Sequence, residues 1–172
     1  MKTLILSSSL SPKSRSFLLC QAVNAALSGQ SIQIDFVDLR DYDLAPVHRS
    51  KTADMERLTE KVKEADNIII GMGVHCYSIN DGLKIVLDTC FGDATNKFFG
   101  IVCAAGGEKS YLSTMHLTQI CMNEWRMIQL PRVIYATGQD FVNDAIANPD
   151  LKERIGIFAK EFYTIGQKLL AE

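Results

Sequence analysis

The chain has 172 residues, a length that suits one domain with a sizeable buried core, and we expect a single domain over residues 1–172. Its 47% hydrophobic and 22% charged residues are typical of a soluble globular protein. A net charge of -2 argues against a nucleic-acid partner, because such proteins are usually basic. No apolar run approaches the roughly 20 residues of a membrane-spanning helix, so we expect no membrane partner.

The cysteines are widely spaced, at Cys20, Cys76, Cys90, Cys103 and Cys121. Without a Cys-x-x-Cys pair, neither a disulfide framework nor a zinc or iron–sulfur site is indicated. An odd number of separated thiols is typical of a reduced protein, and the N-terminal run lacks the cleavage pattern of a signal peptide. We therefore expect a cytoplasmic protein without a metal ion.

Strand-like and helix-like segments alternate along the chain. The predicted strands are Thr3–Ser7, Ile32–Val37, Asn67–Gly71, Phe98–Ala104 and Arg132–Tyr135. The predicted helices lie between the first strand and Gly29, from about Thr52 to Glu64, after Ser78-Ile-Asn-Asp81 as a Ser-x-x-Asp cap, from Ser110 to about Met127, and after the Asn148-Pro149-Asp150 cap. The second strand alternates as an edge strand does, whereas the third is continuously apolar and suits the centre of a sheet.

This alternation predicts an α/β fold in which a doubly wound parallel sheet has helices on both faces. Ligands of such sheets bind outside the C-terminal ends of the strands. The loops after the first, third and fourth strands are therefore the candidate binding loops.

The first of these loops is the serine-rich stretch from Ser7 to Ser16. Serine hydroxyls, the free amides of the next helix and the helix dipole can all bind one phosphate group. The loop lacks the glycines of the nucleotide and dinucleotide patterns, and Cys20 comes too late to be a phosphatase nucleophile. We expect a pocket that holds a phosphate monoester without hydrolysing it; the alternative is an ordinary polar turn.

The second loop, Gly71-Met-Gly-Val-His-Cys-Tyr-Ser78, has two glycines that let its backbone approach a flat ligand. No carboxylate partner for His75 is evident, so we interpret it as a ligand-packing or surface residue rather than a catalytic one. We interpret Cys76 as a space-filling thiol. In the third loop, Gly106-Gly107 suits either a turn with positive φ or a backbone that lies against a ring.

Together the three loops resemble those of the flavodoxin-like NAD(P)H-dependent FMN reductases, a family that includes related quinone and azo-dye reductases. The family pattern Gly-Ser-x-Arg-x-x-Ser-x-Asn is similar to residues 8–16. Ser9 and Ser14 match it, whereas Ser8, Ser11 and Ser16 replace the glycine, the arginine and the asparagine.

A second family pattern, Pro-x-Tyr-x-x-Ser-x-Pro-Gly-x-Leu-Lys-x-x-x-Asp, resembles residues 73–88. It matches at Ser78, Leu83, Lys84 and Asp88, while Gly73 and His75 replace the first proline and the aromatic residue. Gly106-Gly107 matches the glycine-rich third loop of the family.

The resemblance implies a flavodoxin-like five-stranded sheet of order 2-1-3-4-5 and an FMN cofactor. The implied phosphate-binding residues are Ser9, Ser11, Ser14, Arg15 and Ser16, with Lys13 or Arg15 supplying the charge that Ser11 lacks. The implied ring-binding residues are Gly73, Val74, His75, Cys76, Tyr77, Ser78, Ala105, Gly106 and Gly107. No catalytic side chain is implied, because the flavin carries the chemistry.

The resemblance also implies an enzyme that passes hydride from NADPH or NADH to FMN, and then to a small acceptor such as a flavin, quinone or azo compound. Members commonly form homodimers or homotetramers, and Met122, Trp125 and Met127 suit either such an interface or the core.

Three alternatives share this type of sheet. A flavodoxin-type electron carrier would bind FMN without oxidising a nicotinamide, although such carriers tend to be strongly acidic. A cofactor-free binding protein would stay colourless with FMN. A response-regulator domain would need acidic residues where this chain has hydroxyls and glycines.

Overall fold

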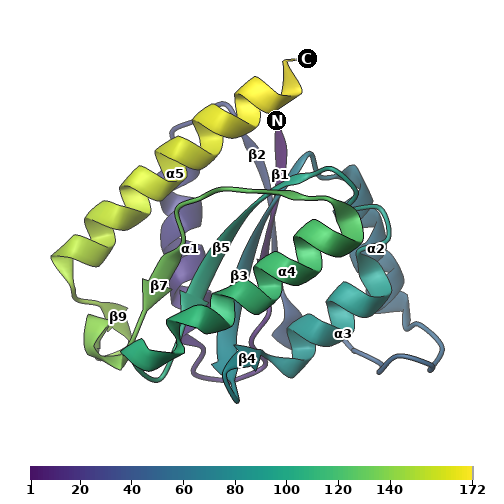
Figure 1. Ribbon diagram of the computed structural model, residues 1–172, viewed down its shortest axis with the longest axis horizontal. Coiled ribbons are helices and arrows are strands. Elements are labelled where there is room, and N and C mark those ends of the chain that lie inside the picture. The colour runs from purple at the N-terminus through teal and green to yellow at the C-terminus, as the bar shows by residue number, and fades with distance from the viewer. Residues whose placement is uncertain (172) are drawn as a thin grey trace.

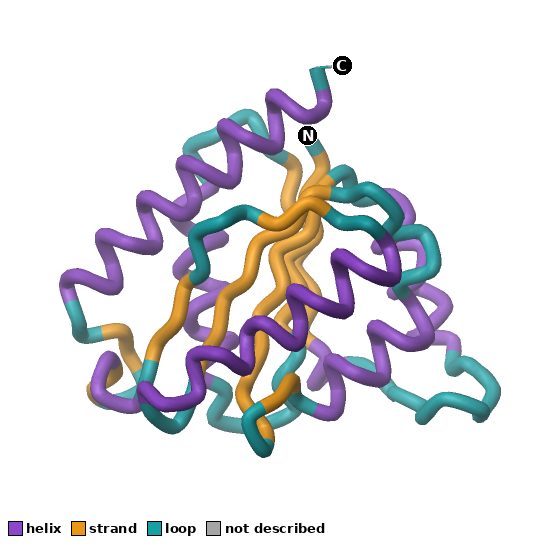
Figure 2. Tube along the Cα trace, viewed as in Figure 1, coloured by secondary structure: helices purple, strands orange, loops and turns teal. Residues whose placement is uncertain are grey.

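A parallel β-sheet crosses the computed structural model, which describes residues 1–171, and helices cover both faces of the sheet (Figures 1 and 2). Its parallel strands are β1 (Lys2–Ser7), β2 (Gln33–Asp38), β3 (Asn67–His75), β5 (Phe98–Ala104), β6 (Ile128–Gln129) and β7 (Ile134–Ala136), and the short β4 (Ser78–Ile79) pairs antiparallel with the end of β3. The helices are α1 (Arg15–Leu27), α2 (Ala53–Glu64), α3 (Asp81–Cys90), α4 (Thr114–Trp125) and α5 (Pro149–Leu170). A separate hairpin joins β8 (Phe141–Val142) and β9 (Ala145–Ile146).

The strand order is β2-β1-β3-β5, and both β6 and β7 pair with the far side of β5. Once the short β4 is set aside, this is the predicted order 2-1-3-4-5, and β2 lies at the edge as expected. The fifth strand is divided in two: β6 pairs with Phe98–Phe99 and β7 with Val102–Ala104. Pro131, which lies between them, has no amide proton to donate to the sheet. The predicted strand Arg132–Tyr135 does not include β6, and it begins two residues before β7 and ends one residue before the end of β7.

Two apolar cores lie on opposite faces of the sheet. Ile5 and Ile69 face the core built with α1 and α5, while Ile68 and Ile70 face the core built with α2, α3 and α4. Figure 1 shows this division, with α1 and α5 on one side and the other three helices on the opposite side. Because successive side chains point to opposite faces, the central strands are apolar throughout.

The helix predictions are confirmed in large part. Met55, Leu58 and Val62 of α2 are buried as expected. The Asn148 side chain accepts a hydrogen bond from the Asp150 amide at the start of α5. The predicted start of α4 at Ser110 is wrong, because a 3₁₀ helix (Glu108–Ser113) comes first.

The segment between β3 and α3 differs from the prediction. β3 continues beyond Gly71 to His75 and turns back into β4, so Ser78 is a strand residue and does not cap α3. Asn80 occupies the N-cap position instead. The Ser78 hydroxyl lies 3.0 Å from Nδ1 of His116.

Within residues 1–171, no helix has both the length and the apolar character that a membrane span requires. The same part of the chain contains no group of three or more His, Cys, Asp or Glu side chains placed to hold a metal ion.

Candidate functional site

The three candidate loops meet at the C-terminal edge of the sheet, at the bottom of Figure 1, and form two adjoining hollows. The smaller hollow, of about 260 Å³, is lined by Ser9, Ser11, Lys13, Ser14, Arg15, Ser16, Gly73, Ala104, Ala105, Gly106 and Asp144. The larger hollow, of about 610 Å³, is lined by Val74, Cys76, Tyr77, Gly106, Gly107, Glu108, Lys109, Ser110 and Gln139. Because Gly106 lines both hollows, one ligand can extend from one into the other.

The smaller hollow presents hydrogen-bond donors. Ser14 is the N-cap of α1: its Oγ accepts from the Phe17 amide at 3.1 Å and lies 3.0 Å from Ser16 Oγ. The amides of Arg15 and Ser16 are the first two of the helix, so they have no partner within it. This combination of hydroxyls, free amides and the positive end of a helix dipole suits an anion.

The hydroxyls of Ser9 and Ser11 accept hydrogen bonds within the loop. Ser9 Oγ accepts from the Ser11 amide at 3.4 Å, and Ser11 Oγ accepts from the Lys13 amide at 3.3 Å. Since each hydroxyl acts as an acceptor in these contacts, its own proton remains available to an anion.

Arg15 is held beside this hollow by two neighbours. Its guanidinium carbon lies 5.5 Å from the centre of the Phe141 ring, and its Nη1 packs so closely that a Cβ on Gly138 would lie 3.0 Å away. A cation over an aromatic face is stabilised there. Arg15 therefore places a positive charge beside the hollow, and Lys13 lines the same hollow. The exposed carboxylate of Asp144 at its rim is screened by solvent.

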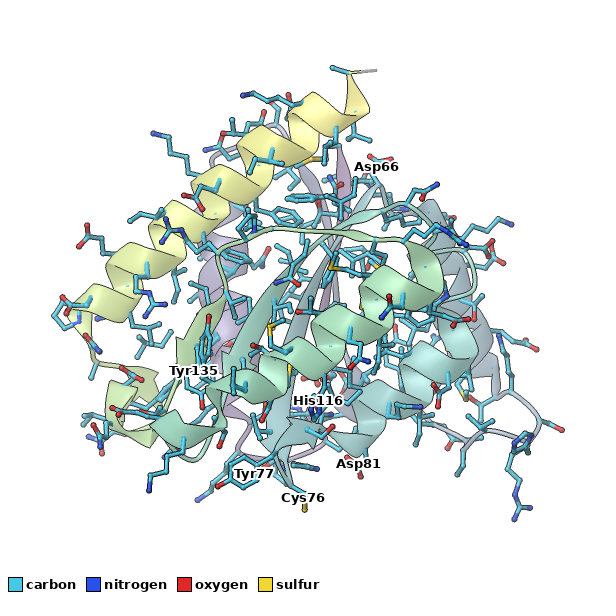
Figure 3. The ribbon with its side chains drawn as sticks, viewed as in Figure 1. Asp66, Cys76, Tyr77, Asp81, His116 and Tyr135 are labelled. Carbon is cyan, nitrogen blue, oxygen red and sulfur yellow. The ribbon has the colours of Figure 1, made fainter. Side chains whose placement is uncertain are left out.

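The β3–β4 hairpin forms one wall of the larger hollow, and its two-residue turn is unusual. Cys76 and Tyr77 have φ angles of 48° and 58°, as in a type I′ turn, which normally contains Asn or Gly. Figure 3 shows both residues at the tip of the hairpin. Cys76 is an exposed free thiol, so its interpretation as a space-filling residue is wrong.

His75 and Ser78 line neither hollow, whereas the other predicted site residues do. The His75 Nδ1 lies 3.7 Å from Asp81 Oδ1, and both side chains are largely exposed. A carboxylate neighbour therefore exists, although the sequence did not reveal it, because the hairpin folds β3 back toward the start of α3.

The third loop lies beside the larger hollow, and Tyr135 anchors it there. The hydroxyl of Tyr135 donates to the Gly107 carbonyl at 2.6 Å, and the Tyr111 ring packs edge-on against the Tyr135 ring. A Cβ on Gly106 or Gly107 would meet nothing within 4 Å, so their backbone is uncovered. None of the glycines in residues 1–171 has positive φ, so the turn interpretation of this pair is wrong and the backbone-against-a-ring interpretation remains.

Asn80 lines neither hollow but connects two of the candidate loops, a role that the sequence analysis did not predict. Its Oδ1 lies 2.9 Å from Ser8 Oγ and accepts from the Gly73 amide at 3.2 Å, while its Nδ2 donates to the Ser8 carbonyl at 2.8 Å. An asparagine just before a helix normally indicates a cap, and this local pattern hides its long-range partners.

These residues fit a ligand with a phosphate group and a flat ring. The smaller hollow has the hydroxyls, amides and cation that a phosphate requires, and the larger hollow has open space beside Gly106 and Gly107 on one side and the β3–β4 hairpin on the other. With the strand order 2-1-3-4-5 and a site at its switch point, they define a flavodoxin-like protein of the flavin-binding type.

Comparison with known proteins agrees. The family model for NADPH-dependent FMN reductase matches residues 1–141. The chain is 28% identical over 166 residues to the NADH-dependent FMN reductase SfnF of Pseudomonas fluorescens, covering 93% of this chain and 89% of that protein. It is 29% identical over 155 residues to an FMN reductase (NADPH) of Pseudomonas aeruginosa, covering 86% and 82%.

A solved structure of an oxidoreductase from Corynebacterium diphtheriae has the same fold, with a TM-score of 0.81, 20% identity and 97% of each chain covered. The chain belongs to the NADPH-dependent FMN reductase family. It is an NAD(P)H-dependent flavin oxidoreductase with FMN as its cofactor, as the three loops predict.

Proposed function

We propose that the smaller hollow holds the FMN phosphate and that the larger hollow holds the isoalloxazine ring. The main observation is that a hydroxyl- and amide-lined hollow adjoins a second hollow, which lies between Gly106-Gly107 and the β3–β4 hairpin, and that Gly106 lines both. One molecule with a phosphate at one end and a flat ring at the other matches this arrangement.

In this proposal, Ser9, Ser11 and one hydroxyl of the Ser14–Ser16 pair donate their protons to the phosphate oxygens, because the other hydroxyl of the pair donates to its neighbour. The amides of Arg15 and Ser16 add two further donors at the start of α1. The Arg15 guanidinium neutralises the charge of the phosphate, in place of the arginine that Ser11 replaces.

The backbone of Val74, Cys76 and Tyr77 hydrogen-bonds the polar edge of the ring, and the backbone of Ala105 to Gly107 lies against it. FMN, when bound, supplies reversible hydride transfer. The role of the chain is to hold the ring and to admit the nicotinamide and then the acceptor to the larger hollow in turn. His75 and Ser78 lie outside both hollows and act at most on the hairpin that carries Cys76 and Tyr77.

The hydride donor is NADH or NADPH, since the printed names of the two relatives include one of each. The acceptor is a small planar molecule, a flavin, quinone or azo compound, because it must stack in the hollow that holds the ring.

We propose a homodimer or homotetramer in which a second copy covers apolar side chains that are exposed on the hairpin tip, on the 3₁₀ helix (Glu108–Ser113) and on α4. Leu112 is 72% exposed and Tyr77 64%, and Met115 and Met122 are exposed on α4. Trp125 and Met127 are buried within the chain, so they belong to the core and not to this surface. Light scattering on an Ala variant of Met115 and Met122 tests the interface: the wild type is oligomeric and the variant shifts toward a monomer.

We also place the protein in the cytoplasm, since all five of its cysteines are free, and reduced thiols persist there. Fractionation of the source cells tests this location.

The site is tested by titrating the purified protein with FMN and with riboflavin, which lacks the phosphate, and then measuring oxidation of NADH and NADPH. We expect tighter binding of FMN and oxidation of at least one nicotinamide. Ser14→Ala removes a hydroxyl of the phosphate site, while Ser28→Ala, at the other end of α1, removes one that bonds only Ala25 O. Only the first should reduce the preference for FMN over riboflavin.

Two results would contradict the proposal in different ways. FMN binding without nicotinamide oxidation is the behaviour of a flavodoxin-type carrier. Absence of any change in the flavin spectrum is the behaviour of a cofactor-free protein.

A further inference from the structure

The side chain of Asn80 connects two loops of the site that are far apart in the sequence. It is fully buried, and both of its polar atoms have partners: Oδ1 meets Ser8 Oγ and the Gly73 amide, and Nδ2 donates to the Ser8 carbonyl. Ser8 precedes the phosphate-binding serines, and Gly73 begins the ring-binding segment. None of these bonds caps α3, although Asn80 occupies its N-cap position.

The place of Asn80 follows from where the strands end. β1 pairs with β3 only as far as Ser7 and Gly71, and the Ser8 amide donates to the Gly71 carbonyl at 3.0 Å. Because alternate residues of a strand direct their amides to the same side, the Gly73 amide also points toward β1, but β1 has already ended. Asn80 Oδ1 accepts a hydrogen bond from the Gly73 amide and so takes the place of the carbonyl that a longer β1 would have supplied.

Ser8 contributes to the same network. Its hydroxyl lies 2.7 Å from the Gly71 carbonyl and 2.9 Å from Asn80 Oδ1, and with one proton it donates to one of them at a time. The backbone is also close here, because a Cβ on Gly82 would lie 3.0 Å from the Ser8 carbonyl. The start of α3 thus packs closely against the phosphate loop, and the hydrogen bonds of Asn80 fix the position of one relative to the other.

We propose that Asn80 is a positioning residue that fixes the phosphate loop (residues 7–16) relative to the end of β3 at Gly73. The phosphate and the ring of FMN then bind to two parts of the site that are already correctly spaced. This inference rests on the proposed FMN site. A buried amide that loses its partners leaves polar groups unsatisfied, so the connection is maintained only by a side chain that both donates and accepts. When two parts of a site are fixed relative to each other, binding of one part helps the other.

The test measures the affinities of FMN and riboflavin for the wild type and for Asn80→Ala, together with the melting temperature of the protein without flavin. We expect the ratio of the FMN affinity to the riboflavin affinity to fall by about tenfold or more in Asn80→Ala, because the phosphate no longer helps to hold the ring. A role in stability alone would lower the melting temperature and leave this ratio unchanged.

Asn80→Asp provides a second variant in case Asn80→Ala does not fold. A carboxylate still accepts from Ser8 Oγ and from the Gly73 amide, but its second oxygen faces the Ser8 carbonyl with no proton to donate, so we expect the ratio to fall in this variant too. Asn67→Ala is the matched control, since Asn67 is a buried asparagine at the opposite end of β3. Its ratio should equal that of the wild type, whatever its melting temperature.

The outcomes are distinct. An unchanged ratio in folded Asn80→Ala and Asn80→Asp overturns the proposal for Asn80 while leaving the FMN site in place. A wild type that does not prefer FMN to riboflavin overturns the phosphate site itself.

Discussion

The sulfur of Cys20 on α1 packs directly against the α-carbon of Gly71 on β3. A Cβ added to Gly71 would lie 2.1 Å from this sulfur and 3.3 Å from the Leu6 carbonyl. Both residues are buried, and Gly71 is two residues before Gly73 in the ring-binding segment. The contact therefore sets how closely α1, which begins at the serine-rich loop, approaches β3, which leads to the β3–β4 hairpin.

Gly71→Ala should destabilise the protein by about 1–3 kcal/mol, because the new methyl group must displace the Cys20 sulfur in a packed core. Adding Cys20→Ala removes that sulfur, so the double variant should be more stable than the sum of the two single changes predicts. Urea unfolding of the four proteins measures the coupling. Gly29→Ala, where a Cβ meets nothing within 4 Å, controls for the glycine substitution itself. Strict additivity would show that the sulfur is not the obstacle.

Arg15→Gln should weaken FMN binding by roughly 10- to 100-fold, since a hydrogen bond to a charged group contributes about 1.5–3 kcal/mol. Riboflavin binding should be unaffected, and the dependence of FMN affinity on salt should become shallower. Flavin fluorescence titrations at two salt concentrations measure both effects. Arg49→Gln, in a loop that lines neither hollow, is the control. If only Lys13→Gln weakens FMN, Lys13 and not Arg15 supplies the charge.

Much of the fold could be predicted because its signals are local. The continuous apolar run of Asn67–Gly71 requires burial on both faces, and the serines before α1 predict a capped helix start, which Ser14 provides. The alternation of strands and helices then leaves few topologies. These features gave the sheet order and most of the residues that line the two hollows.

The missed features depend on contacts between distant residues. The partners of Asn80 include Ser8, 72 positions away, and local sequence indicates only a helix cap. The extension of β3 through Gly73 has weak strand propensity, and it is stabilised by β5 on one side and by Asn80 on the other. The division of the fifth strand is signalled by Pro131, but which half pairs where is decided by β5.

Tyr77→Gly should stabilise the protein by about 1 kcal/mol relative to Tyr77→Ala, because glycine alone adopts the φ of 58° without a Cβ penalty. For a chain of this length, such a gain raises the melting temperature by roughly 2–4 °C. Both variants lose the aromatic ring, so they should bind FMN equally and more weakly than the wild type. Calorimetry and FMN titration measure the two effects. Equal melting temperatures would mean that the turn carries no strain.

Stability should fall steeply above pH 9. Burial raises the pKa of the Cys20, Cys103 and Cys121 thiols to about 12, from an ordinary value of 9.0. Below pH 9 each thiol keeps its proton in both states, whereas between pH 9 and 12 only the unfolded chain ionises. The native state then binds more protons, and the free energy of unfolding falls by about 1.4 kcal/mol per pH unit for each thiol.

Burial also lowers the pKa of Lys97 from its ordinary value of 10.5, which acts in the opposite direction, whereas burial raises the pKa of Tyr42 and of Tyr135 and so acts in the same direction as the thiols. Urea unfolding at pH 8 and pH 10 in the presence of a reductant measures the net effect. Cys121→Ala should make the fall with pH shallower, since one buried thiol is removed, whereas Cys76→Ala removes an exposed one and should leave the slope as it is. A free energy of unfolding that is the same at both pH values would show that the buried thiols do not control alkaline stability.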